Sequence, residues 1–213
     1  MAKTPKRTDM LHHLISYMNI NGFSGLRMDD IIRIAHASRT TVYRYFSSKD
    51  AVMAAVITEY CDFIDDLQLP TANNDQTAML IGLNELIKAQ LLFESSLSRR
   101  FRQELATEYP QLSSTLNTSI EKFDQQQRQF YTHGQTLKLF NQANPTLWLL
   151  ADHEMIPTLL DEHYLVTHSL AVRQALIDYV NFKFEQVVRP EYQEQLIVSD
   201  IEPTIDKLLQ SRL

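Results

Sequence analysis

Hydrophobic residues recur at three- and four-residue spacing along most of this chain. Between Thr8 and Asn21 they occupy positions 10, 11, 14, 15, 17 and 18, which is typical of an amphipathic helix that ends near Gly22. The same spacing predicts short helices over 28–35 and 39–46. A longer apolar stripe, running from Val52 to Leu67 after a cap at Ser47 or Ser48, predicts a fourth helix.

After the polar stretch 70–74, the pattern stays helical to the end of the chain. We expect a break at Gly134 and a kink or an end at Pro157. The further helices predicted from the pattern span 77–93, 95–108, 112–131, 145–160, 169–188 and 201–213. No convincing pair of strands and no internal repeat is visible. The prediction is an all-α fold with an N-terminal domain at 1–68 and a larger helical domain at 69–213.

Composition supports a helical protein and excludes several functional classes. Only 4 of the 213 residues are glycine, which argues against a turn-rich β-sandwich and against Gly-rich nucleotide loops. The single cysteine, Cys61, excludes a disulfide framework. No nucleophile elbow or P-loop occurs, so we expect no enzymatic activity and no cofactor. The longest apolar run, Ala51 to Ile57, is far shorter than the ~18 residues of a membrane span, and we expect a cytoplasmic protein.

The charge is divided unevenly along the chain. The formal net charge is −6, yet residues 1–50 carry eight Lys and Arg against four Asp, a net +4, which leaves −10 for the remainder. Such asymmetry suggests a basic end that meets a polyanion, although chance clustering on a solvated surface is an equal alternative.

Two short helices joined by a tight turn lie within this basic segment and predict a helix-turn-helix. Ser38 is a good cap for the helix over 39–46, in which Val42 and Phe46 share the inward face. The side chains left to point outward are Arg39, Thr40, Tyr43 and Arg44. In such a motif the second helix enters the major groove, where Arg pairs with guanine and Thr meets a thymine methyl or a phosphate.

The segment from about 8 to 60 resembles the DNA-binding domain of the TetR family of transcriptional regulators. The resemblance rests on Gly22-Phe23, Met28-Asp29-Asp30-Ile31, Ala35, Ser38, and above all on the run from Thr41 to Ala51. It differs where His36 replaces a frequent Gly and where Arg27 replaces a frequent Thr. His36 must then tolerate the turn conformation or shift it, and Arg27 could reach a phosphate by charge.

The resemblance implies roles for individual residues and a double-stranded operator as partner. Tyr43 and Lys49 correspond to phosphate contacts, Thr41 to a further backbone contact, and Arg39, Thr40 and Arg44 to positions that meet bases. The full set of expected DNA-binding residues is Arg27, Arg39, Thr40, Thr41, Tyr43, Arg44, Tyr45 and Lys49.

For the rest of the chain the resemblance implies a helical domain for effector binding and homodimerisation. A two-fold dimer would present two recognition helices to a palindromic site, and the helices over 145–160 and 169–188 are the candidates for its interface. The candidate effector-binding residues are Phe93, Arg100, Phe101, Tyr131, Trp148 and Tyr164. Each has an alternative role, the aromatic residues in the core and the arginine in solvent. We expect a repressor released by a small molecule of unknown identity.

Two alternatives remain open at this stage. His153, His163 and His168, with neighbouring acidic residues, could form a metal-sensing site, although none of these histidines forms a clean i, i+4 pair. The helical body could also bind a ligand or a protein while the helix-turn-helix has lost its affinity for DNA.

Overall fold

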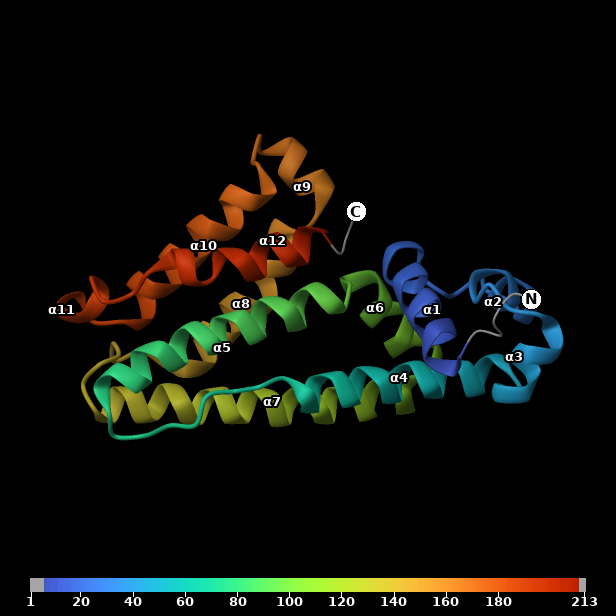
Figure 1. The fold of residues 1–213 in the computed structure, drawn as a ribbon, viewed down its shortest axis with the longest axis horizontal. Helices are drawn as coiled ribbons and strands as arrows, with labels where there is room; N and C mark the ends of the chain where they lie inside the picture. The colour runs from blue at the N-terminus through green and yellow to red at the C-terminus, as the bar shows by residue number, and fades with distance from the viewer. Residues whose placement is uncertain (1–5, 211–213) are drawn as a thin grey trace. The chain divides into compact units, whose positions relative to one another are not determined.

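The computed structural model describes residues 6–210 (Figure 1), and within them every regular element is helical. The only β-type pairing there is one isolated bridge between Phe140 and Val188. The predicted all-α fold is therefore confirmed. The chain divides into two compact units, one of residues up to Asp66 with Leu97–Glu121, the other of Leu67–Ser96 with the residues from Lys122 onward.

The first unit contains the N-terminal helices together with α6 and the beginning of α7. Helix α1 packs against α2, α4 and α6, and α2 packs against α3. The bounds are α1 Arg7–Asn21, α2 Met28–Ile34, α3 Arg39–Tyr45, α4 Lys49–Asp66 and α6 Arg99–Glu108. The buried face of α1 consists of four of the positions that its apolar spacing indicated: Met10, Leu11, Leu14 and Met18. Residues 97–121 fall in this unit, although the division expected from the sequence assigns them to 69–213.

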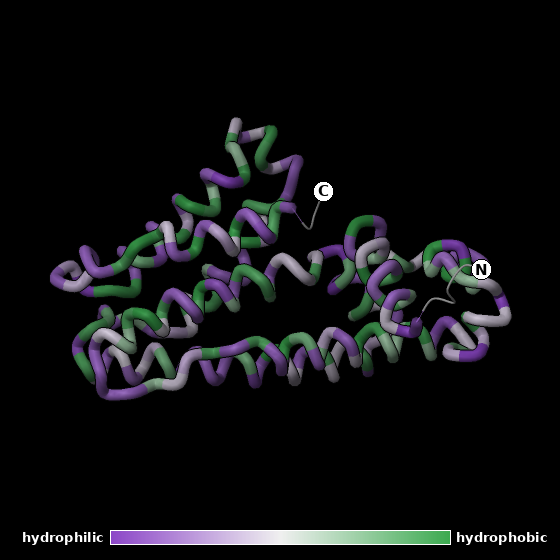
Figure 2. The backbone as a smooth tube through the Cα atoms, in the orientation of Figure 1, coloured by the Kyte–Doolittle hydropathy of each residue, from purple (hydrophilic) through white to green (hydrophobic). Residues whose placement is uncertain are grey.

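The second unit is built around α5, which packs against α8 and α12, while α8 also packs against α10. Its elements are α5 Gln76–Ser96, α7 Pro110–Thr136 from residue 122 onward, α8 Pro145–Leu159, α9 Glu162–Thr167, α10 Val172–Val187, α11 Pro190–Gln193, the 3-10 turn Val198–Asp200, and α12 Glu202–Gln210. Apolar side chains of all the longer helices form one core, which includes Leu83, Tyr131, Trp148 and Val180. The tube in Figure 2 shows hydrophobic and hydrophilic residues alternating along these helices, as amphipathic packing requires.

Three local features can be compared with the sequence prediction. Gly134 lies in the last turn of α7, which ends two residues later at Thr136. The ring of Phe140 occupies the space that a Cβ at position 134 would need. Pro157 lies within the last turn of α8, which ends two residues later at Leu159. The short helix α9 was not predicted, and it begins at a cap in which Asp161 accepts the Tyr164 N–H.

The start of α8 follows its predicted chemistry. The Asn144 side chain accepts a hydrogen bond from the Thr146 N–H at 3.0 Å, and Pro145 occupies the first turn. Within residues 6–210, no helix combines the length and the apolar character that a membrane crossing requires.

Candidate nucleic-acid interface

Helices α2 and α3 form the predicted helix-turn-helix. His36 adopts a left-handed conformation with φ of 48°, so it tolerates the turn geometry that glycine adopts more easily. Its ring meets that of His13 edge-on, with ring centroids 4.8 Å apart. Ser38 caps α3 as predicted, because its hydroxyl accepts the Thr41 N–H at 3.2 Å.

Helix α3 has one buried and one exposed face. Val42 and Phe46 are buried against the rest of the first unit. The side chains of Arg39, Thr40, Tyr43 and Arg44 are exposed, and both Tyr43 and Tyr45 retain 40% of their accessible surface. A seven-residue helix therefore presents two cations, a hydroxyl and two phenols to solvent on a buried apolar support.

The exposed cations of α3 are held by aromatic neighbours. The guanidinium of Arg39 lies 5.5 Å from the centroid of the Tyr43 ring, and that of Arg44 lies 4.9 Å from the Tyr45 ring. Arg44 also donates to the Tyr45 hydroxyl at 3.3 Å. These contacts restrict the arginine rotamers and lower the entropy lost when a ligand is bound. The ion pair of Arg39 with Asp29 is exposed on both sides and stabilises little.

The remaining residues that we expect to contact DNA differ in the interactions that they already make within the protein. Arg27 is exposed at the start of α2, where its backbone N–H donates to the Asp30 carboxylate. The Thr41 hydroxyl is 2.9 Å from that of Ser38 and is half-buried. Lys49 donates to the carbonyl of Phe23 at 3.1 Å and pairs with Glu108 at 3.5 Å. The ammonium of Lys49 therefore has a structural partner in the same unit.

Two carboxylates of α6 are important residues that the sequence pattern did not reveal. Glu104 accepts the backbone N–H groups of Phe23 and Ser24 at 2.5 and 2.9 Å. Burial by itself would raise the pKa of Glu104, but these hydrogen bonds and one from Arg100 outweigh it and lower the pKa to about 2. The hydrogen bonds of Glu104 and the Lys49–Glu108 pair together hold the loop between α1 and α2 against α6.

The candidate effector-binding residues do not all meet at one place. Phe101 packs in the first unit, 5.2 Å from the Phe23 ring, and the neighbouring Arg100 is exposed and pairs with Glu104. The other four candidates belong to the second unit: Phe93, Tyr131, Trp148 and Tyr164. Among these, Tyr131 and Trp148 have ring centroids 5.1 Å apart. Tyr164 instead stacks on His168.

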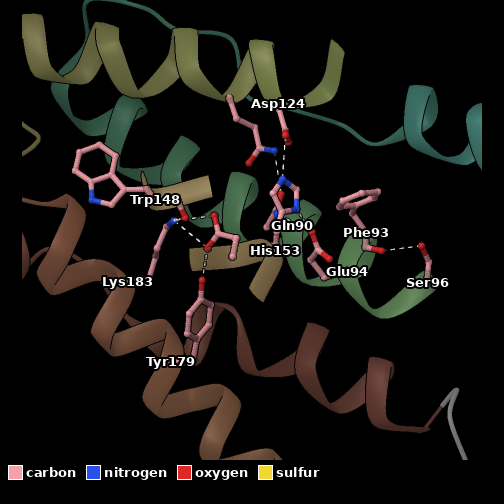
Figure 3. Close-up of polar contacts among 11 residues, drawn as sticks. Gln90, Phe93, Glu94, Ser96, Asp124, Trp148, His153, Tyr179 and Lys183 are labelled. Carbon is pink, nitrogen blue, oxygen red and sulfur yellow. Dashed lines mark hydrogen bonds and ion pairs between the residues drawn. The ribbon is translucent and has the colours of Figure 1, made fainter. Parts of the chain in front are cut away.

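A buried polar network occupies the interior of the second unit (Figure 3). His153 of α8 lies between Glu94 of α5 and Asp124 of α7, bonded to Glu94 through Nδ1 and to Asp124 through Nε2 at 2.9 Å. Burial favours neutral His153, but the hydrogen bonds and charges of Asp124 and Glu94 outweigh this and raise its pKa to about 10. The imidazole is therefore protonated at neutral pH. Gln90 donates to Glu94 at 3.2 Å, and Gln127 donates to Gln90 at 2.9 Å.

A second set of buried charges lies beside this network. The Lys183 ammonium donates to both Asp152 oxygens, at 2.9 and 2.7 Å, and to the Trp148 carbonyl at 3.0 Å. Burial lowers the pKa of Lys183, and the charge of Asp152 opposes that change. Asp152 also accepts a hydrogen bond from the Tyr179 hydroxyl, whose pKa is raised by burial and by the charge of Asp152. All three donor positions of the lysine are thus used within the protein.

The suggested metal site is not assembled in the part of the chain that the structure describes. Over residues 6–210, no group of three or more His, Cys, Asp or Glu side chains has an arrangement that could hold a metal ion. His153 bonds to two carboxylates, and His168 stacks on Tyr164 at 4.1 Å between ring centroids.

The helix-turn-helix and its exposed cationic face define a DNA-binding transcriptional regulator rather than an enzyme. A family profile described as "Bacterial regulatory proteins, tetR family" matches residues 18–56, which extend from α1 into α4. Residues 18–56 therefore carry a TetR-type DNA-binding segment, and the resemblance seen in this part of the sequence is confirmed.

Solved structures share this fold at low sequence identity. A Vibrio parahaemolyticus protein described as a TetR-family transcriptional regulator is 19% identical, with a TM-score of 0.55 over 87% of this chain and 100% of that one. SmeT in complex with triclosan is 14% identical, with a TM-score of 0.58 over 86% and 92% of the two chains. TylP of Streptomyces fradiae, described as a TetR regulator, is 9% identical, with a TM-score of 0.55 over 95% and 96%.

Two further comparisons complete this result. A profile described as a Pre-PUA-like domain matches residues 83–164, a segment that is predominantly helical here and contributes to both compact units. No curated protein matches the sequence.

Proposed function

We propose that this chain is a ligand-responsive repressor that binds a palindromic operator as a homodimer and is released by a small-molecule effector. It would act in the cytoplasm, where the chromosomal operator lies. The observation that carries the proposal is the exposed face of α3. Its opposite face is buried through Val42 and Phe46, and the exposed side chains are Arg39, Thr40, Tyr43 and Arg44.

The chemistry of this face suits a duplex. Arg39, Thr40 and Arg44 meet base edges in the major groove, where a bidentate arginine distinguishes guanine from the other bases. Phosphate contacts then position the helix and supply most of the salt-dependent affinity. The residues proposed to contact the backbone are Arg27, Thr41, Tyr43, Tyr45 and Lys49.

Apolar side chains exposed on the second unit support a dimer. Leu147, Leu150 and Met155 of α8 are exposed, and their spacing of three and eight residues places them on one side of that helix. Phe182 is exposed on α10, which packs against α8. A second copy covering both helices would remove these side chains from water, which is the usual basis of a stable homodimer interface.

Repression and the binding of a small molecule are supported by one protein of similar fold. SmeT is described as the repressor of the Stenotrophomonas maltophilia multidrug efflux pump SmeDEF, and it is 15% identical to this chain with a TM-score of 0.56. It has also been solved with triclosan bound. For this chain, we propose that Phe93, Tyr131 and Trp148 of the second unit surround the effector.

The direct test is binding of the purified protein to the DNA upstream of its own gene, measured by fluorescence anisotropy at several salt concentrations. We expect sequence-selective binding that weakens as salt increases. Arg44→Ala should weaken the preference for this DNA, while Arg189→Ala, which removes the same charge from the second unit, should leave binding unchanged. If Tyr43→Ala and Lys49→Ala both bind like the wild type, the helix-turn-helix does not bind DNA and the proposal fails.

A further inference from the structure

The ammonium group of Lys49 is surrounded by oxygen atoms of the first unit. It donates to the carbonyl of Phe23 at 3.1 Å and lies 3.5 Å from the carbonyl of Ser24. It also pairs with a carboxylate oxygen of Glu108 at 3.5 Å. These three oxygens match the three N–H groups of the ammonium, and the Lys49 side chain retains only 21% of its exposure. A phosphate oxygen can therefore reach this ammonium only by displacing one of the three.

Glu108 is the partner that a phosphate displaces most easily. The two carbonyls belong to the loop between α1 and α2, which Glu104 fixes by accepting the backbone N–H groups of Phe23 and Ser24. At 3.5 Å, the Lys49–Glu108 pair is longer than a charge-assisted hydrogen bond, which spans about 2.7–2.9 Å. Glu108 also keeps 29% of its exposure, so water can solvate the carboxylate once the pair opens.

The carboxylate of Glu108 has room to move away from Lys49. A cavity of about 620 Å³ adjoins it within the first unit, lined by Asp50, Ala54, Glu108, Tyr109 and Leu112. Glu108 can turn into this space without displacing a packed side chain. The movement is not without cost, because Asp50 lines the same cavity and its carboxylate repels that of Glu108.

The position of Glu108 within α6 adds to this cost. Glu108 is the last residue of the helix. The backbone carbonyls at this end carry a partial negative charge, which disfavours an acidic side chain. The pair with Lys49 offsets this repulsion in the free protein. When Lys49 turns to a phosphate, Glu108 loses that compensation, so binding must overcome the stabilisation that the pair supplies.

The arginine side chains of α3 are held in a different way. The guanidinium of Arg44 lies on the ring of Tyr45, a contact with the aromatic face that uses none of its N–H groups. Arg39 does pair with a carboxylate, that of Asp29, but both side chains retain more than two thirds of their exposure. Solvent screens such a pair almost completely. Lys49 therefore differs from these arginines in being paired with an acidic residue away from bulk water.

We propose that Glu108 limits the affinity of this protein for DNA by competing with a phosphate group for the ammonium of Lys49. Binding exchanges one anion for another: the phosphate accepts from the N–H group that Glu108 releases, and the carboxylate turns to solvent. The inference rests on the proposed function, because it takes Lys49 as a contact to the DNA backbone. It adds a residue of α6 to those that set DNA affinity.

Glu108→Gln tests the competition, because glutamine keeps the size of the side chain and removes its charge. Affinity for the DNA upstream of the gene is measured by fluorescence anisotropy at several salt concentrations. We expect the variant to bind at least about fivefold more tightly than the wild type. The slope of log affinity against log salt should steepen by up to about 0.9 per protomer, because no freed carboxylate then takes up a cation. Unchanged affinity and slope overturn the proposal.

Two controls separate competition from a general effect of charge. Glu85→Gln removes a carboxylate that is also paired with a lysine, Lys88 at 2.9 Å, but in the second unit, and should bind like the wild type. In a Lys49→Met background, Glu108→Gln should change affinity less than twofold. The same gain in both backgrounds means that Glu108 acts without Lys49 and overturns the proposal.

The melting temperature distinguishes competition from a structural role of the pair. Because the pair is partly exposed, Glu108→Gln should lower the melting temperature by at most about 4 °C. A larger loss of stability without a gain in DNA affinity would show that the pair serves the fold alone, and would overturn the proposal.

The outcome is separable from that of the proposed function. If the wild type binds its upstream DNA selectively and Glu108→Gln binds identically, DNA binding stands and the competition fails. If the wild type does not bind but Glu108→Gln does, in a salt-dependent way, the competition stands and operator binding by the wild type fails. If neither protein binds DNA, both proposals fail.

Discussion

The carboxylate of Glu104 accepts a hydrogen bond from the backbone N–H of Phe23 at 2.5 Å. The two residues are 81 positions apart in the chain and belong to the same compact unit. Because Phe23 lies in the loop between α1 and α2, α6 holds the segment that precedes the helix-turn-helix. The DNA-binding unit is therefore completed by a helix distant from it in the sequence.

Glu104 should make the stability of the first unit depend on pH. Its pKa is lowered to about 2, whereas a glutamate in an unfolded chain titrates near about 4.3. The stabilisation is therefore present above about pH 5 and lost as the pH falls towards 2. Glu104→Gln should lower the free energy of unfolding at pH 7 by about 1–2 kcal/mol. The free energy of unfolding, measured with urea, should change less between pH 5 and 3 in this variant than in the wild type. An identical pH profile would contradict the assignment.

Substitutions at Lys49 and Arg44 should differ in their effects on stability and on DNA affinity. Lys49 donates to the Phe23 carbonyl and pairs with Glu108, whereas Arg44 contacts only the neighbouring Tyr45 among the interactions described for it. Lys49→Met should therefore lower both the free energy of unfolding, by about 1 kcal/mol, and the affinity for the operator. Arg44→Ala should reduce affinity by about 1–3 kcal/mol and leave the melting temperature unchanged. Calorimetry and anisotropy on the two variants check this, and a Lys49→Met protein of normal stability would refute the structural role.

The His36→Gly variant should be more stable than the His36→Ala variant. Its φ of 48° lies in the left-handed region, which alanine tolerates poorly and glycine adopts readily. His36→Ala keeps this strain and loses the ring contact with His13, while His36→Gly relieves the strain. We expect the glycine variant to be more stable than the alanine variant by about 1 kcal/mol. Thermal unfolding of both measures this difference, and the reverse order would show that the turn relaxes when the imidazole is absent.

The buried pair of Lys183 and Asp152 should be costly to break and less costly to remove. Each side chain retains only 2–3% of its exposure, so Lys183→Met leaves an uncompensated charge in the core and should cost about 3–5 kcal/mol. Adding Asp152→Leu removes that charge and should restore part of the loss. Recovery should stay incomplete, because Asp152 also accepts the Tyr179 hydroxyl. Denaturant unfolding of the single and double variants tests this, and a double variant less stable than Lys183→Met would contradict it.

Local sequence signals predicted the helices and the exposed face of α3 well. The cap at Ser38, the buried face of Val42 and Phe46, and the exposure of Arg39 and Arg44 all depend on residues within eight positions of one another. Helical periodicity and capping act over this range, so the sequence alone is sufficient. The break predicted at Gly134 falls two residues before the end of α7, and the contact with the Phe140 ring that excludes a Cβ there was not visible in the sequence.

The sequence by itself determined that this protein is all-α, that its basic end carries a helix-turn-helix, and which side of α3 faces outward. Only the tertiary structure showed that Glu104 holds the loop at Phe23 and that His153 joins Glu94 to Asp124, partners 59 and 29 residues away. It also showed that Gln127 and Tyr131 of α7 are fully buried. The physical reason is that helix formation depends on near neighbours, whereas the partner of a buried polar group depends on how helices distant in the sequence pack together.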